Sequence, residues 1–272
     1  MSAIITQLNI YPVKSCRGIA LAEGLLTDEG LEYDRQWMIV ASRGEFLTQR
    51  ELPRLALIGT SVRDDVLMLT VPGTGSISVP PPLADSTCSV RVWRDNCRGF
   101  DCGEDIARIL TRFLERDVRL VKFDPSAARY SDRKFTAEIA APLRFSDGFP
   151  ILLIAEESLE DLNARLPAPL PMNRFRPNIV IKGLGPYSED RVHEFRMGAV
   201  TLRVVKPCMR CKITATDQAT AEVDKQEPLR SLKKYRWNRI LRGAAFGQNV
   251  VVAAGVNHSL RVAQPIEVSW RA

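Results

Sequence analysis

Short alternations of apolar and polar residues dominate the chain and predict a series of β-strands. Runs of this kind cover residues 4–11, 33–40, 66–71, 89–93 and 118–123. A period of two places alternate side chains on one face of a sheet, which is typical of half-buried strands. Because turn residues such as Asp64-Asp65 and Pro72-Gly73 separate the runs, we expect a barrel or sandwich in the first hundred residues.

Helical spacing of apolar residues is rarer. Ile106, Leu110 and Phe113 share one face of residues 104–114, and acidic residues open this run, which favours a helix. Residues 227–235 predict a second helix, and Ser158 with Asp161 resembles a capping box that opens a third. The expected fold class is mainly β with some helices (α+β).

Composition predicts a soluble protein of a reducing compartment. The 272 residues are 45% apolar, and 38 Lys and Arg against 32 Asp and Glu give a net charge of +6. This excess is small and dispersed, without a dense basic run, so we expect no nucleic-acid partner. Six cysteines are too few for a disulfide scaffold of this length, and no secretory signal opens the chain. The longest apolar run, 149–155, is far shorter than a bilayer span, so we expect no membrane segment and a cytoplasmic location.

The run Cys208-Met209-Arg210-Cys211, flanked by Lys206 and Lys212, is the strongest candidate for chemistry. Apolar alternation on both sides predicts two strands that meet at a tight turn. Nearby cations favour a thiolate, the form that binds metals. A structural zinc site needs four ligands, and the sequence offers no second pair of Cys or His, so we expect no zinc. A dithiol that exchanges disulfides belongs at the start of a helix, whereas residues 212–216 alternate like a strand, so we expect no such dithiol either. A functional thiolate at Cys211 and a plain turn with two half-buried thiols remain as alternatives.

Two further segments carry groups that suit an anion. Lys14 and Ser15, in the turn Tyr11-Pro12-Val13-Lys14-Ser15-Cys16, could bind a phosphate through a point charge and a hydroxyl. Arg176 offers a bidentate fork, and Asn178 both donates and accepts. Taken singly, each segment is equally well interpreted as a surface loop.

In this order the segments resemble the MOSC family, the molybdenum-cofactor sulfurase C-terminal-like domains, and within it the amidoxime-reducing branch. The matching motifs are Tyr11 to Cys16, Asp34-Arg35, Phe175-Arg176-Pro177-Asn178-Ile179-Val180, Cys208-Met209-Arg210-Cys211, Thr214-Ala215-Thr216-Asp217 and Phe246-Gly247-Gln248-Asn249. The resemblance covers nearly the whole chain. It implies a β-rich MOSC N-terminal domain in residues 1–122 and a MOSC β-barrel domain in residues 123–272.

The resemblance also implies a cofactor and its ligands. Cys211 would give its sulfur to the molybdenum of a molybdopterin cofactor. The residues that would hold the pterin and its phosphate are Lys14, Ser15, Arg35, Ser158, Arg176, Asn178 and Arg210. The chemistry agrees, because an anionic pterin needs convergent cations and a soft thiolate suits a metal already bound by sulfur.

The activity implied is a molybdenum-dependent reduction of N-hydroxylated or N-oxide compounds, such as hydroxylamines, amidoximes and N-hydroxy nucleobases. No cysteine follows Cys211, so a C-terminal iron–sulfur domain is not expected. The electrons should therefore come from a separate donor protein, a reductase or a ferredoxin-like or cytochrome-like protein, and a basic face would suit an acidic donor. The alternative is a module that carries the cofactor, or a persulfide on Cys211, for delivery elsewhere.

Overall fold

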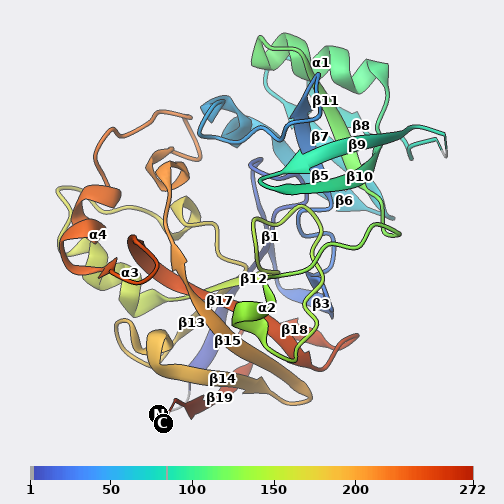
Figure 1. Ribbon diagram of the computed structural model, residues 1–272. Coiled ribbons are helices and arrows are strands. Elements are labelled where there is room, and N and C mark those ends of the chain that lie inside the picture. The colour runs from blue at the N-terminus through green and yellow to red at the C-terminus, as the bar shows by residue number, and fades with distance from the viewer. Residues whose placement is uncertain (1–2, 84, 272) are drawn as a thin grey trace.

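The computed structural model describes residues 3–83 and 85–271 and contains two β-rich units (Figure 1). The strands are β1 (Ala3–Ile10), β2 (Ile19–Leu21), β3 (Glu23–Thr27), β4 (Gly30–Leu31), β5 (Trp37–Ala41), β6 (Gly59–Arg63), β7 (Val66–Val71), β8 (Gly75–Ser78), β9 (Thr87–Val92), β10 (Asp95–Asp101), β11 (Val118–Phe123), β12 (Ile151–Ala155), β13 (Ile179–Lys182), β14 (Val192–Met197), β15 (Val200–Met209), β16 (Trp237–Asn238), β17 (Gly243–Ala254), β18 (Ser259–Arg261) and β19 (Pro265–Trp270). The helices are α1 (Glu104–Leu114), α2 (Arg133–Thr136), α3 (Glu156–Asn163) and α4 (Leu229–Tyr235), with the 3₁₀ turns η1 (Pro53–Leu57), η2 (Met172–Arg174), η3 (Ser188–Arg191) and η4 (Lys212–Ala215). The expected α+β class, mostly strand, is confirmed.

The larger unit is a closed barrel. Its strands follow the order β12-β13-β1-β19-β14-β15-β17, and β17 pairs back with β12 to close the barrel. The β12–β13 pair is parallel, whereas the other neighbours are antiparallel. Alternate side chains point inward, as a period of two requires, and Ile5, Phe195 and Leu202 are fully buried in this core. Closure removes the exposed sheet edges of this unit.

The smaller unit consists of two sheets and one helix around a second core. The sheets have the strand orders β5-β11-β10-β9 and β6-β7-β8. Ile39, Leu69 and Leu120 from the strands pack with Leu110 of α1 in this core. The helix occupies Glu104–Leu114 as its apolar spacing predicted, and its two opening acids lie at the positive end of the helix.

Strand β1 connects the two units, since it starts the chain but pairs with β13 and β19 of the barrel. Strand β3 likewise pairs with β18 near the C-terminus. A division at residue 122 therefore does not separate the two cores, because the N-terminal strands complete the C-terminal sheets.

The structure corrects two local predictions. Residues 212–216 do not form a strand: Cys211 is followed by the 3₁₀ turn η4, in which the Thr214 amide and hydroxyl both donate to the Cys211 carbonyl. The tight turn predicted at Pro207 is also absent there, because Pro207 lies within β15. Five residues are too few for alternation to distinguish a strand from a helical turn.

The capping box predicted at Ser158 is wrong as well. Helix α3 starts at Glu156 after Ala155, so Ser158 lies inside the helix and not at its cap. No helix in the described ranges is long and apolar enough to span a bilayer.

Candidate functional site

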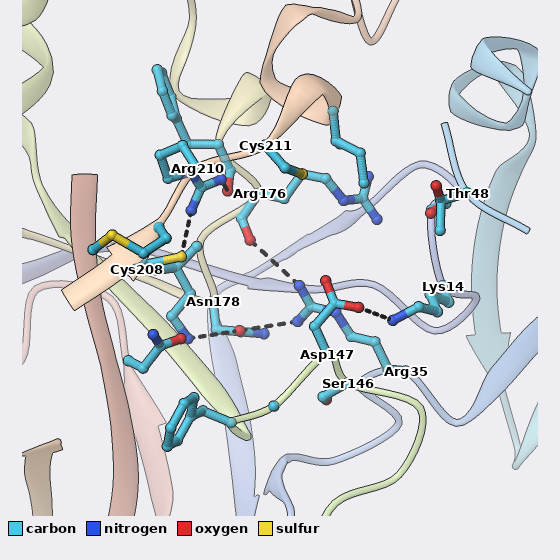
Figure 2. Close-up of a pocket in the computed structure, with 18 residues that line it drawn as sticks. Lys14, Arg35, Thr48, Ser146, Asp147, Arg176, Asn178, Cys208, Arg210 and Cys211 are labelled. Atoms are coloured by element: carbon cyan, nitrogen blue, oxygen red, sulfur yellow. Dashed lines mark hydrogen bonds and ion pairs between the residues drawn. The ribbon is translucent and has the colours of Figure 1, made fainter. Parts of the chain in front are cut away.

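A pocket lies among the segments that adjoin the barrel strands β1, β12, β13 and β15 (Figure 2). Seven of the eight site residues predicted from the sequence line it, namely Lys14, Ser15, Arg35, Arg176, Asn178, Arg210 and Cys211. They come from the turn after β1, the segment before β5, the segment before β13 and the end of β15. The chain therefore assembles four distant segments into one site.

Lys14 is held by the loop that precedes β12. Its ammonium donates to the Phe145 carbonyl at 2.8 Å and to Asp147 Oδ1 at 2.6 Å. Burial lowers the pKa of Lys14, although the Asp147 carboxylate opposes that effect. Partial desolvation raises the pKa of Asp147, whose side chain is still 56% exposed, but the Lys14 charge outweighs it and the net pKa is well below the usual range. The two groups therefore form an ion pair at the pocket wall.

The ring of Tyr11 contacts the guanidinium groups of two arginines. The ring centroid lies 4.4 Å from the Arg35 guanidinium carbon and 4.2 Å from that of Arg176. The phenol donates to the Pro177 carbonyl at 3.1 Å, and Gly18 makes room for the ring, because a Cβ there would lie 2.5 Å from it. Arg35 is also ion-paired with the buried Asp34 carboxylate, so an anion as well as the cation–π contacts offsets the repulsion between the two guanidinium groups.

Three lining residues have left-handed backbone conformations. Ser15, Arg35 and Arg176 have φ angles of 68°, 48° and 56°, which non-glycine residues adopt at an energetic cost. Such strain persists only where the surrounding structure enforces it. Here the strained backbone directs these side chains towards one pocket.

Arg176 has an unused donor. Its Nη1 donates to Gln218 Oε1 at 3.3 Å, but its buried Nη2 has no hydrogen-bond partner in the described structure. Burial lowers the pKa of Arg176 to about 10. A buried guanidinium with an unmet donor is costly on its own and indicates that an anion belongs beside it.

Asn178 is committed to the protein. Its Oδ1 accepts from Arg35 Nη1 at 3.0 Å and from the Leu152 amide at 3.1 Å, and its Nδ2 donates to the Asn9 carbonyl at 3.2 Å. The residue is buried and joins β1 to β12. Its role in the pocket is therefore to position Arg35.

Arg210 and the two cysteines form the opposite wall. Arg210 Nη1 donates to Cys208 Sγ at 3.0 Å and Nη2 to the Phe175 carbonyl at 2.7 Å, while its buried Nε lacks a partner in the described structure. The Cys211 thiol is exposed and Cys208 is half-buried. Of the three cations expected around Cys211, only Arg210 lines the pocket: Lys206 lies over the Phe135 ring, and Lys212 lines a different hollow.

Ser158 does not join the site. It is fully buried, and its hydroxyl donates to both oxygens of Glu189 at 2.8 and 2.9 Å and accepts from the Tyr187 amide at 2.8 Å. Burial raises the pKa of Glu189 to about 7. The Ser158 hydroxyl therefore already hydrogen-bonds the Glu189 side chain and is not free to bind a cofactor phosphate.

Sequence reasoning missed several lining residues. Thr48, Ser146, Asp147 and Phe149 also border the pocket, and only the turn-like Ser146-Asp147-Gly148 gave a signal. Asp217 caps a turn by accepting from the Ala219 and Thr220 amides at 2.7 and 3.0 Å.

The chain matches two family models, the MOSC N-terminal beta barrel domain over residues 2–117 and the MOSC domain over residues 140–269. It is 40% identical over 241 residues to mitochondrial amidoxime-reducing component 1 of Mus musculus, covering 85% of this chain and 71% of the relative. The chain belongs to the MOSC family. The human component 1 is 37% identical over 242 residues, covering 85% of this MOSC protein and 72% of the relative.

A solved solution structure of a protein from Bordetella bronchiseptica matches this MOSC protein less closely. The identity is 22% and the TM-score 0.31, over 38% of this chain and 88% of the other. This likeness bears on neither fold nor function. The family resemblance expected from the motifs is confirmed by the family models and the amidoxime-reducing relatives.

Proposed function

We propose that this protein reduces N-hydroxylated compounds, such as hydroxylamines, amidoximes and N-hydroxy nucleobases, with a molybdenum–molybdopterin cofactor in the pocket. The observation that carries the proposal is a set of buried hydrogen-bond donors that have no partner in the described structure. Arg176 and Arg210 each bury a guanidinium nitrogen that lacks a partner in the described structure, and both line the cavity to which Cys211 belongs. The names of the amidoxime-reducing relatives support the same activity.

The lining residues fit the cofactor chemically. A phosphorylated pterin is an anion, and the unmet donors of Arg176 and Arg210 suit its oxygens. Ser15 adds a hydroxyl, and the Cys211 thiolate is a soft ligand for a metal already bound by sulfur. When bound, the cofactor supplies the two-electron chemistry of R–NHOH + 2 e⁻ + 2 H⁺ → R–NH₂ + H₂O.

Neighbouring residues of the protein hold the cationic side chains of the pocket in position. Asn178 and Tyr11 hold Arg35, and Cys208 with the Phe175 carbonyl holds Arg210. Asp147 remains ionised beside Lys14, so it fixes the ammonium and does not act as a proton donor at neutral pH. A separate electron-transfer protein supplies the two electrons.

The test uses protein expressed with an intact cofactor pathway. We expect stoichiometric molybdenum and turnover of hydroxylamine with reduced methyl viologen. Cys211→Ser should lose more than about a hundredfold in turnover, since even residues that only support a metal ligand contribute ten- to a hundredfold. Cys88→Ser, in the smaller unit, is the matched control.

Normal hydroxylamine reduction by Cys211→Ser would show that this thiol is not the metal ligand. Stoichiometric metal without any turnover would favour the second candidate, a cofactor carrier or sulfur-transfer module. The exposed position of the Cys211 thiol is the observation in favour of that candidate.

A further inference from the structure

A second hollow, of about 650 Å³, adjoins the cofactor pocket across the turn η4. Ile213 of this turn lines the pocket, whereas Lys212 and Ala215 line the hollow. Helix α4 packs against η4 and forms the hollow's other side. One turn of 3₁₀ helix therefore separates the hollow from the residues around Cys211.

The hollow is strongly basic. Lys212, Lys225, Arg230, Lys233 and Lys234 line it. Within the described ranges none of them forms an ion pair, whereas about half of the other arginines in residues 123–271 do. The one carboxylate among its described lining residues is Asp224, whose Oδ1 already accepts from the Gln226 and Glu227 amides at 2.7 and 3.0 Å. Five cations against one carboxylate leave the hollow with a net positive charge.

This region also accounts for the charge of the whole protein. Residues 206–242 contain ten Lys and Arg against four Asp and Glu, an excess of six, which equals the net charge of +6 of the complete chain. The rest of the protein is electrically balanced. Residues 212–235, from η4 to the end of α4, hold five Lys and Arg against four Asp and Glu, so most of this excess comes from the residues on either side, namely Lys206, Arg210, Arg236, Arg239 and Arg242.

We propose that the basic hollow, with the adjoining face of α4, is the docking surface for a small acidic electron-transfer protein. The proposal rests on the proposed function, since it identifies where the donor of that reaction binds. Electron-transfer encounters bury little area and depend on complementary charge, as an unpaired cluster of cations next to a redox pocket provides. Val223, 47% exposed, and Leu229 add apolar contact within the hollow.

The wall between hollow and pocket is held in place. Arg174 donates from Nη1 to the Ala215 carbonyl and from Nη2 to Asp217 Oδ2, both at 2.9 Å. Arg174 is itself buried, and its bonds tie η4 to the turn η2. A docked donor would meet a preformed surface. Two reduced one-electron donors then become oxidised for each N–O bond that is cleaved, with two protons taken up and one water released.

The experiment uses the cofactor-loaded protein and an acidic plant-type [2Fe–2S] ferredoxin as the probe. The variant Lys233→Glu/Lys234→Glu reverses two exposed charges in the last turn of α4. The control Arg112→Glu/Arg116→Glu makes the same charge change at the end of α1, an exposed site in the smaller unit (Figure 1). Calorimetry measures ferredoxin affinity at several salt concentrations, and reduced methyl viologen measures turnover independently of docking.

We expect the α4 variant to lose about tenfold or more in ferredoxin affinity at low salt, with the difference vanishing at high salt. Its viologen-driven turnover should match the unmodified protein, and the α1 control should bind ferredoxin normally. The proposal is overturned if the unmodified protein does not bind ferredoxin, if both variants lose affinity equally, or if the α4 variant loses none.

A single-stranded oligonucleotide serves as the competing probe. If it binds more tightly than ferredoxin and only the α4 variant loses that binding, the surface is a nucleic-acid site and the docking proposal fails. If ferredoxin binds through α4 but viologen drives no turnover in the unmodified protein, the docking surface stands and the proposed reductase function is what fails.

Discussion

Arg210 donates from its Nη1 to the sulfur of Cys208 at 3.0 Å, beside the exposed thiol of Cys211. The two cysteines of the motif therefore have different surroundings. Cys208 is half-buried and accepts a charge-assisted hydrogen bond, whereas the Cys211 sulfur has no hydrogen-bond partner in the described part of the chain. The spacing of two residues between them lets one thiol hold the arginine while the other remains available.

Replacing Cys208 with Ala should weaken cofactor retention without abolishing turnover. Arg210 would keep its bond to the Phe175 carbonyl but lose one partner, worth about 1 kcal/mol or roughly fivefold in affinity. Molybdenum content after gel filtration measures the loss, and Cys208→Ser should restore it because a hydroxyl also accepts. Complete inactivity of Cys208→Ala would instead place this sulfur among the metal ligands.

Tyr11 offers a test of how the arginines are held. Tyr11→Phe removes only the bond to the Pro177 carbonyl and should cost about 1 kcal/mol of unfolding free energy. Tyr11→Leu also removes the ring under Arg35 and Arg176, and should cost roughly 3 kcal/mol and weaken cofactor binding. Urea unfolding and metal content separate the two effects. If Tyr11→Phe and Tyr11→Leu both fold and retain equal amounts of cofactor, the ring of Tyr11 does not position the two arginines.

The buried Glu189 makes stability depend on pH. Because burial raises its pKa from 4.5 to about 7, the folded protein holds a proton there that the unfolded chain has released. This contribution is complete below pH 4.5 and is lost as the pH rises through about 7. It amounts to roughly 3 kcal/mol at most, at about 1.4 kcal/mol per pH unit.

Glu189→Gln should flatten that dependence between pH 5 and 8 in urea unfolding, because a neutral amide cannot release a proton. Glu160→Gln, an exposed change on the same helix as Ser158, is the control and should leave the slope unchanged. A slope in Glu189→Gln as steep as in the unmodified protein would assign the pH dependence to another group.

Asn178→Ala should lower both stability and cofactor affinity. It removes the acceptor of Arg35 Nη1 and of the Leu152 amide and the donor to the Asn9 carbonyl, a loss of roughly 2–4 kcal/mol. The matched control is Asn163→Ala, which breaks two bonds to Leu170 outside the pocket. If both variants lose stability but keep equal metal content, Asn178 has no part in orienting Arg35 for the cofactor.

The amino-acid sequence alone predicted the α+β class and several elements residue for residue, among them Glu104–Leu114, Val66–Val71 and Val118–Phe123. These elements follow from local periodicity, which six or more residues express clearly. The motifs around Lys14, Arg176 and Cys211 also identified the chemistry, because cations and a soft thiol are recognisable from residue type and order.

Only the tertiary structure decided which of these groups meet. Asn178 and Arg35 are 143 positions apart and touch because β1 pairs with β13 inside the barrel and brings the segments next to these strands together. Ser158 fits the same chemistry, yet the fold turns its hydroxyl to Glu189. The five residues after Cys211 alternate like a strand but form a turn, which brings the basic α4 beside the pocket. Long-range pairing and burial determine these positions, and neither is encoded in the spacing of neighbouring residues.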